Sequence, residues 1–190
     1  MVRTTGGDVR GVTAEGVTSF RGIPYGADTG GAARFLPPKT PDPWTGTLHA
    51  DAYGADAVQS RGPRPKAGAT TNNFDLPPGE DCLRLNVWTP SADDAKRPVM
   101  VWLHGGGFYS GSASGSMYEG ANLARRGDVV VVSINHRLGA LGFLHLAYLT
   151  DAPDSVNVGM LDIVLALEWV RDNVAAFGGD PSNVTLFGES

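Results

Sequence analysis

The sequence predicts an α/β protein whose central sheet is mainly parallel and is preceded by an N-terminal antiparallel meander. Two observations support this fold class. In the second half of the chain, short apolar runs alternate with helical patterns, which is typical of parallel strands that helices connect. Near the N-terminus, apolar and polar residues alternate around glycine-containing turns, which favours antiparallel strands.

The N-terminal segment alternates from Val2 to Phe20 around the turns Gly6-Gly7 and Glu15-Gly16. Glycine accepts the backbone angles of tight hairpin turns, so we expect a small antiparallel meander here. The stretch Ser60 to Gly79 is rich in proline and glycine and predicts a long surface loop. Composition alone leaves open whether this loop has a function.

The later strands and helices are predicted from apolar runs and their period. The expected strands are Leu83 to Trp88, Pro98 to Leu103, Asp128 to Ile134 and Val184 to Phe187.

Two helices are predicted between these strands. Tyr118 to Arg126 fits a short helix, and roughly Val158 to Phe177 is the clearest helix in the chain. The glycines at 178 and 179 and then Pro181 end the longer one. Its broad apolar side is predicted from Leu161, Val164, Leu165, Leu167 and Val170.

Composition places the chain among soluble globular proteins, since 42% of its 190 residues are hydrophobic and 18% are charged. Its net charge is −5 and no Lys/Arg cluster is dense, so nucleic acid is not an expected partner. The apolar stretch Leu138 to Leu149 is too short to span a bilayer, so no membrane association is expected. The first eight residues lack the apolar segment of a signal peptide, and we expect a cytoplasmic enzyme.

The last three residues, Gly188-Glu189-Ser190, directly follow a predicted buried strand. Gly-x-Ser in that position is the first half of a nucleophile elbow, in which a sharp turn lifts the serine oxygen to the top of the sheet. Alone the tripeptide is a weak signal, because it occurs by chance in many proteins.

A second motif, His104-Gly-Gly-Gly-Phe108, follows the strand that ends at Leu103. Three glycines allow backbone N–H groups to point to one place, as the oxyanion of a tetrahedral intermediate requires. A flexible glycine-rich loop is the ordinary alternative. A dinucleotide-binding fingerprint fails, because Ser110 stands where its third glycine belongs, and no phosphate-binding Gly-Lys-Ser/Thr occurs.

Together with other motifs, these two elements give the family. The sequence resembles the type-B carboxylesterases, the cholinesterase-like branch of the α/β-hydrolase superfamily, over nearly its whole length. The other motifs that carry the resemblance are Phe20-Arg-Gly-Ile-Pro-Tyr25, Gly79-Glu-Asp-Cys-Leu-Arg-Leu-Asn-Val-Trp88, Asn135-His-Arg-Leu-Gly139, Asn157-Val-Gly-Met-Leu-Asp162 and Phe177-Gly-Gly-Asp-Pro-Ser-Asn-Val184.

The resemblance implies an incomplete α/β-hydrolase fold, with residues 1–190 as the N-terminal portion of one catalytic domain that is truncated at its nucleophile. In that fold the strand Val99 to Leu103 should lie between Val129 to Ile134 and Val184 to Phe187, parallel to both, with right-handed connections. The outer side of the Val184 strand should have no partner.

The resemblance implies further that Ser190 is the nucleophile and that Gly106 and Gly107 donate to the oxyanion. Ser190 and the glycine loop should therefore lie close together at the same edge of the sheet, at the carboxyl end of the Val184 strand. Glu189 and Phe108 are the candidates for substrate contact. The implied reaction is hydrolysis of a small-molecule ester, and it needs no metal or organic cofactor.

In this fold the triad order is serine, then acid, then histidine. All four histidines of the chain precede Ser190, so we expect the acid and the base beyond it. His104 adjoins the glycine loop, and we interpret it as a residue that orients this loop through hydrogen bonds.

The resemblance also implies contacts between segments far apart in the sequence. Arg34 should meet Glu80 and Arg137 should meet Asp162, and we expect both pairs to be buried. Cys82, the sole cysteine, should be a free and buried thiol, because the position of its usual disulfide partner is occupied by alanine, Ala57.

Other departures from the family concern the substrate. The loop before Cys82 contains no tryptophan to stack on a quaternary ammonium group, so choline esters are not expected. Ile163 stands where the family usually has glutamine, and His136 stands where it often has tyrosine. We expect neither change to touch the chemistry.

Two alternatives stay open. Some cholinesterase-like domains are non-catalytic binding or adhesion proteins, but they commonly lose the serine or the glycines that this chain retains. The chain could also be an inactive truncated gene product. The acyl and alcohol specificity and the oligomeric state are not given by the sequence.

Overall fold

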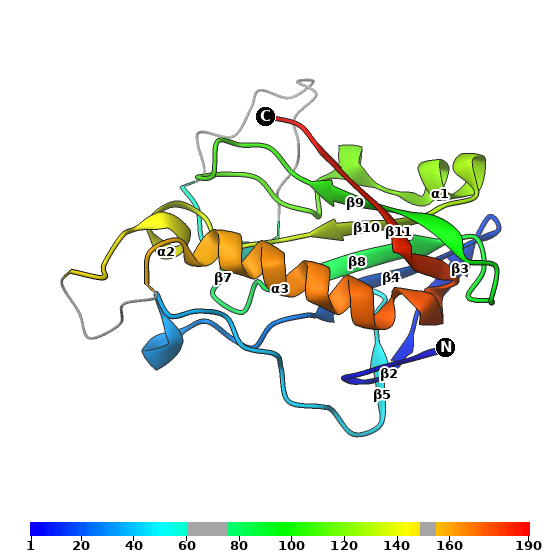
Figure 1. The fold of residues 1–190 in the computed structure, drawn as a ribbon, viewed down its shortest axis with the longest axis horizontal. Helices are drawn as coiled ribbons and strands as arrows, with labels where there is room; N and C mark the ends of the chain where they lie inside the picture. Colours follow the sequence, from blue (N-terminus) through cyan, green and yellow to red (C-terminus); the bar gives the residue numbers. More distant parts are fainter. Residues whose placement is uncertain (61–75, 149–154) are drawn as a thin grey trace.

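The computed structural model describes residues 1–60, 76–148 and 155–190. Its centre is a six-stranded sheet with the strand order β11-β9-β10-β8-β4-β3 (Figure 1). In chain order these strands are β3 Val12–Ala14, β4 Val17–Pro24, β8 Arg84–Thr89, β9 Arg97–Leu103, β10 Val130–Ile134 and β11 Gly179–Gly188.

β9 lies between β10 and β11 and runs parallel to both. Val99 pairs with Val130 on one side and with Val184 on the other. The predicted order of the three apolar runs is therefore confirmed. The prediction that the Val184 strand is buried is wrong, because β11 is an edge strand on which Thr185 is exposed and Leu186 is 49% exposed. In the described part of the chain, β11 has no partner on its outer side, which leaves a row of backbone groups open to pairing.

The rest of the sheet is antiparallel. β8 runs antiparallel to β10 and β4, and β4 runs antiparallel to β3. The prediction of a mainly parallel sheet is therefore wrong for this chain, whose sheet is mixed. The reason lies in β8, where every residue from Leu85 to Thr89 is buried. A strand covered on both faces gives the same apolar run in either direction.

The N-terminal segment forms two hairpins and not one meander. β1 Val2–Thr4 and β2 Gly7–Arg10 pair antiparallel and join β5 Thr47–His49 in a separate three-stranded sheet. β3 and β4 form the second hairpin at the edge of the central sheet. The chain changes sheets at Gly11, where a Cβ atom would overlap the Ser19 carbonyl oxygen and the Phe20 ring.

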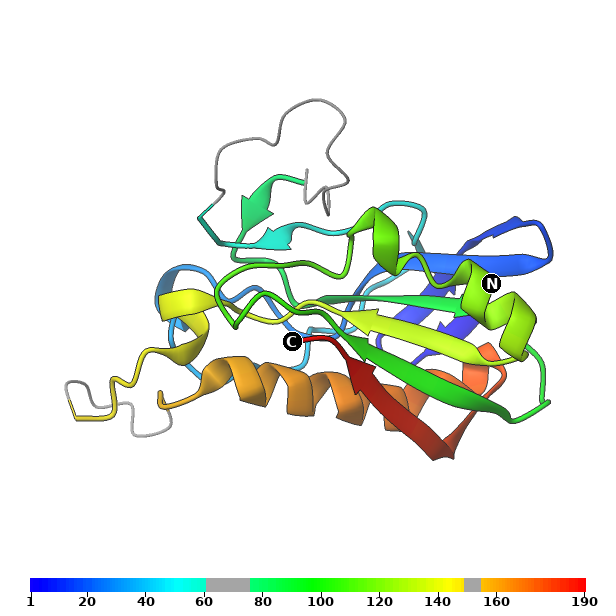
Figure 2. The same ribbon diagram turned by 90° about the horizontal axis from the view of Figure 1, so that it is seen from above.

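Two helices cover opposite faces of the sheet (Figure 2). α1 spans Ala121–Gly127, slightly later than predicted, because the 3-10 turn η2 Ser116–Tyr118 precedes it. α3 spans Val158–Asn173 and continues as the 3-10 turn η3 Val174–Phe177, which ends at Gly178 with φ 83 as its glycine predicts. The short helix α2 Gly139–Phe143 and the turn η1 Gly31–Ala33 complete the helical elements of the described residues.

The buried face of α3 differs in part from the predicted one. Leu161 and Val164 are 38% and 50% exposed. Val170 lies in the core as predicted, and Leu165 and Leu167 pack against it partly buried. The core side of α3 also carries Ile163, Ala166 and Trp169, which were not predicted. The helix is apolar around most of its circumference, so periodicity did not select the side that faces the sheet.

The small strands β6 Asp56–Ala57 and β7 Pro78–Gly79 pair parallel to each other, at the two ends of the predicted proline-rich loop. Residues 61–75 of that loop lie outside the described residues, and the loop prediction is not tested. No helix in the described ranges is long and apolar enough to cross a membrane.

Candidate active site

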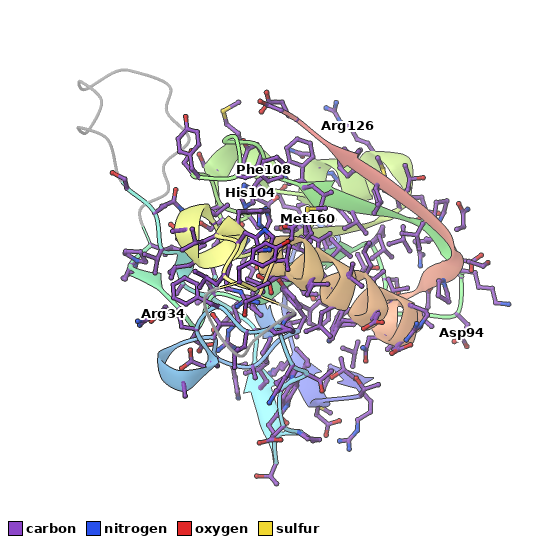
Figure 3. All side chains as sticks on the ribbon, turned by 60° about the vertical axis from the view of Figure 1, so that its left-hand side comes forward. Arg34, Asp94, His104, Phe108, Arg126 and Met160 are labelled. Atoms are coloured by element: carbon purple, nitrogen blue, oxygen red, sulfur yellow. The ribbon has the colours of Figure 1, made fainter. Side chains whose placement is uncertain are left out.

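A cavity of about 320 Å³ lies at the carboxyl ends of β9 and β11. This edge is where open α/β sheets bind their ligands. Figure 3 shows His104, Phe108 and Met160 close together, near the beginning of α3 and beside α2. The lining residues are Leu103, His104, Gly105, Gly107, Phe108, Ser110, His136, Leu138, Met160, Ile163, Gly188, Glu189 and Ser190.

Ser190 lies at the carboxyl end of β11 and lines this cavity together with the glycine loop. The backbone of Glu189 packs tightly on Gly105, since a Cβ atom there would lie 2.5 Å from both the carbonyl oxygen and Oε2 of Glu189. The prediction that the glycine loop and Ser190 share one edge of the sheet is confirmed. Four of the five predicted site residues line the cavity, and Gly106 is the neighbour of Gly107 in the loop.

The glycine loop adopts a conformation that side chains disfavour. Gly106 and Gly107 have φ angles of 114 and 60. The Gly106 carbonyl oxygen accepts hydrogen bonds from the N–H groups of Tyr109 at 3.2 Å and Ser110 at 3.1 Å, which closes the loop into a turn. Among the described residues, the N–H groups of Gly106 and Gly107 donate to no protein acceptor. Both N–H groups are therefore free to bind a ligand.

Phe108 forms the outer wall of the cavity. It is 57% exposed and has a φ of 63, which is uncommon for an aromatic residue. Its ring lies 5.1 Å from that of Phe143, which in turn meets His136 edge-on at 6.2 Å. The opening of the cavity is therefore bordered by aromatic surface.

His104 is held in one orientation beneath the loop. Its Nδ1 lies 2.9 Å from the Gly105 carbonyl oxygen, and because a carbonyl only accepts, Nδ1 carries the proton. The ring stacks on that of His136 at 5.0 Å and an interplanar angle of 6°. Burial, and then the neighbouring His136, lowers the pKa of His104 to about 4, so the ring is neutral near pH 7. This geometry fits the predicted role of orienting the loop.

His136 and Ile163, the two departures from the family pattern, both line the cavity. His136 is buried, and its Nδ1 donates to the Arg137 carbonyl oxygen at 2.9 Å. Burial lowers the pKa of His136. Sequence reasoning also missed Leu138 and Met160, which lie within motifs of the family but carry no reactive group.

Both predicted ion pairs are present. Arg137 binds Asp162 in a bidentate pair, and both side chains are buried. Arg34 binds Glu80 with two contacts of 2.5 Å, but the Arg34 side chain is 46% exposed, so the prediction that this pair is buried is wrong. Both residues lie outside the helices and strands, Arg34 directly after η1 and Glu80 directly after β7.

Cys82 is a free buried thiol, as predicted. Burial, and then the charge of Asp162, raises its pKa to about 12, which keeps the thiol protonated and unreactive.

No group of three or more His, Cys, Asp or Glu side chains in the described ranges could hold a metal ion. The groups that the cavity offers are a serine hydroxyl, free N–H donors and an apolar wall, which suit attack on an uncharged carbonyl carbon.

The chain is similar to known proteins over its whole length. A family model described as the carboxylesterase family matches residues 1–190. The chain is 46% identical over 191 residues to the para-nitrobenzyl esterase of Bacillus subtilis (strain 168), of which it covers 38%. It is also 46% identical over 198 residues to the acetylcholinesterase of Gallus gallus and covers 26% of that protein. Both alignments include the whole of this chain.

The same similarity is found among solved structures. A carboxylesterase of Geobacillus stearothermophilus superposes with a TM-score of 0.88 at 46% identity. The superposition covers all of this chain and 37% of that one. The chain thus spans well under half the length of the proteins it matches.

Proposed function

The chain belongs to the carboxylesterase family, and on that premise we propose that the protein hydrolyses carboxylic esters of small molecules with Ser190 as its nucleophile. The observation that carries the proposal is the meeting of Ser190 with the glycine loop in one cavity. These two features come from motifs more than eighty residues apart and converge only in the fold.

In the proposed first step, Ser190 Oγ bonds to the ester carbonyl carbon while a histidine beyond residue 190 takes the hydroxyl proton. The carbonyl oxygen becomes an oxyanion that accepts hydrogen bonds from the N–H groups of Gly106 and Gly107. Collapse of this intermediate breaks the bond to the alcohol, which leaves with the proton. Water then attacks the acyl-enzyme by the same steps and releases the carboxylic acid.

The loop geometry supports the assignment of the oxyanion donors. The Gly106 carbonyl is engaged within the loop, whereas the N–H groups of Gly106 and Gly107 have no acceptor among the described residues. A developing oxyanion would supply that acceptor without any rearrangement of the loop. Such preorganised donors stabilise charge more in the transition state than in the ground state.

The cavity wall supports an uncharged substrate. Phe108, Met160 and Ile163 present apolar surface to the bound molecule, and the neutral rings of His104 and His136 add no charge. Glu189 is the one ionisable carboxylate of a side chain in the lining, and we assign it to contact with the substrate or with Gly105.

The test is steady-state and burst kinetics of the full-length gene product on an activated short-chain aryl ester. We expect turnover in the wild type and loss of it in Ser190→Ala. A fluorophosphonate should label the wild-type protein once, and peptide mass spectrometry should place the label on Ser190. Label on another residue, or full turnover by Ser190→Ala, would show that the serine assignment is wrong.

A further inference from the structure

The glycine loop leaves the cavity at Gly111, and the side chain of Gln59 binds both polar backbone groups of this residue. The Gly111 N–H donates to Gln59 Oε1 at 2.9 Å, and Gln59 Nε2 donates to the Gly111 carbonyl oxygen at 2.8 Å. Nε2 also donates to the Ala57 carbonyl oxygen at 3.1 Å. A primary amide has one acceptor oxygen and two N–H donors, and all three are used here.

Gly111 in turn fixes the first residues of the loop. It is buried and has a φ of 112. A Cβ atom on Gly111 would overlap the Gly105 carbonyl oxygen and Nδ1 of His104. These two atoms form the hydrogen bond that orients the imidazole. The position of Gly111 therefore controls the peptide groups immediately before the proposed oxyanion donors.

The chain beyond Gly111 has its own anchors. Ser112 Oγ and Ser114 Oγ donate to Asp56 Oδ1 at 2.5 Å and 2.8 Å, and the Ala113 N–H donates to Asn135 Oδ1 at 2.7 Å. Because these bonds do not involve Gln59, a change at Gln59 should release the loop locally and leave the fold intact.

We propose that Gln59 is a positioning residue for the oxyanion hole, and that it acts through its paired hydrogen bonds to Gly111. Gln59 does not line the cavity, so it touches neither the substrate nor the reacting atoms. The inference rests on the proposed function, because it assigns Gln59 a role in holding the donors of Gly106 and Gly107. An oxyanion hole misplaced by about 1 Å loses on the order of 10²-fold in rate.

The first experiment replaces Gln59 by methionine, whose side chain has a similar length but cannot form these hydrogen bonds. In the full-length gene product, Gln59→Met should lower kcat about 10- to 100-fold and leave KM within about two-fold. Inhibition by a trifluoromethyl ketone, which forms a tetrahedral adduct with the serine, should weaken by the same factor as kcat/KM. The matched control is Val58→Ala, whose side chain is 41% exposed, and it should change neither constant.

The second experiment uses Gln59→Glu, whose protonated carboxyl can again accept from the Gly111 N–H and donate to its carbonyl. The carboxylate has no donor and faces two carbonyl oxygens. The ratio of the kcat of Gln59→Glu to the kcat of the wild type should therefore be low near about pH 8. This ratio should rise as the pH falls toward about 5, where the introduced carboxyl of the variant begins to protonate. The same ratio for Gln59→Met should not depend on pH.

The outcomes separate the two proposals. Turnover that persists in Ser190→Ala contradicts the proposed function. If turnover depends on Ser190 but Gln59→Met retains the wild-type kcat, the positioning role alone is wrong. A pH-independent ratio for Gln59→Glu overturns it as well, and this ratio decides the question if Gln59→Met does not fold.

Discussion

The Arg137 guanidinium binds the Asp162 carboxylate through two hydrogen bonds, from Nε to Oδ2 at 2.9 Å and from Nη2 to Oδ1 at 2.6 Å. The Arg137 N–H donates to the same carboxylate at 3.0 Å, and the guanidinium reaches the Leu36 carbonyl oxygen at 2.8 Å. One buried pair thus joins the segment after β10 to α3 and to the N-terminal region, directly behind the cavity residues His136 and Ile163.

Removal of one partner of this pair should strongly destabilise the protein. Asp162→Ala leaves a buried guanidinium without its counter-charge, and we expect the free energy of unfolding to fall by about 3–5 kcal/mol. Urea denaturation of the full-length protein measures this loss. The control is Glu80→Gln at the solvent-exposed pair with Arg34, which should change stability far less. Equal losses in the two variants would contradict the role of burial.

Acid should destabilise the fold through His104. In the unfolded chain an imidazole takes up its proton near about pH 6.5, whereas the pKa of His104 in the fold is about 4. Between these values the unfolded state holds more protons, so stability falls as the pH falls through this window, by on the order of 3 kcal/mol in total. Burial lowers the pKa of His136 as well, which acts in the same direction.

Urea denaturation at a series of pH values checks this dependence. His104→Gln should reduce the slope of stability against pH in that window, whatever its effect on stability at pH 7. A slope equal to that of the wild type would mean that another group causes the acid sensitivity.

A side chain on Gly106 should impair the proposed oxyanion hole. Its φ is 114, and an added Cβ atom would overlap the Ser110 carbonyl oxygen, so Gly106→Ala must open the loop. We expect kcat on an activated ester to fall by about 10²–10³-fold, as for loss of one oxyanion donor. Gly46→Ala is the matched control, because Gly46 has a φ of 79 but open space around it. A Gly106→Ala variant as active as this control would exclude Gly106 from the oxyanion hole.

The Cys82 thiol should be inert in the folded protein. Burial raises its pKa to about 12, and thiolate is the species that alkylating reagents attack. Iodoacetamide at about pH 8 should therefore leave Cys82 unmodified in the native protein and modify it in denaturant, as peptide mass spectrometry would show. Labelling of Cys82 in the native protein at the rate of a free thiol would show that the region around it opens readily.

Residues 1–190 expressed alone should not turn over an ester. Serine is a weak nucleophile until a base takes its proton, and no histidine follows Ser190 in these residues. His104 is a poor substitute, since its pKa is about 4 and its Nδ1 is bound to the Gly105 carbonyl. The assay compares this polypeptide with its Ser190→Ala form. Multiple turnovers that vanish in the variant would identify a base within the 190 residues, with His104 the first to test.

The sequence by itself determined those features that depend on local chemistry. The apolar runs of β9 and β10 are specified by residues that a fully solvated strand would rarely carry, whereas the order in which β9, β10 and β11 lie parallel was implied by the family motifs. The end of η3 at Gly178 and the bent backbone at Gly106 and Gly107 follow from glycine, which alone adopts positive φ without strain. The joint position of Ser190 and the glycine loop followed from motifs that end two neighbouring parallel strands.

Only the tertiary structure decided which partner each element meets. The direction of β8 is absent from its sequence, because a strand buried on both faces has the same composition either way. The exposed positions of Leu161 and Val164 depend on what covers α3 and not on its periodicity. The bonds between Gln59 and Gly111 join residues 52 positions apart. The number of donors and acceptors on a side chain is given by its residue type. Which distant group it binds depends on which group the fold brings within about 3 Å, and no local sequence pattern specifies that partner.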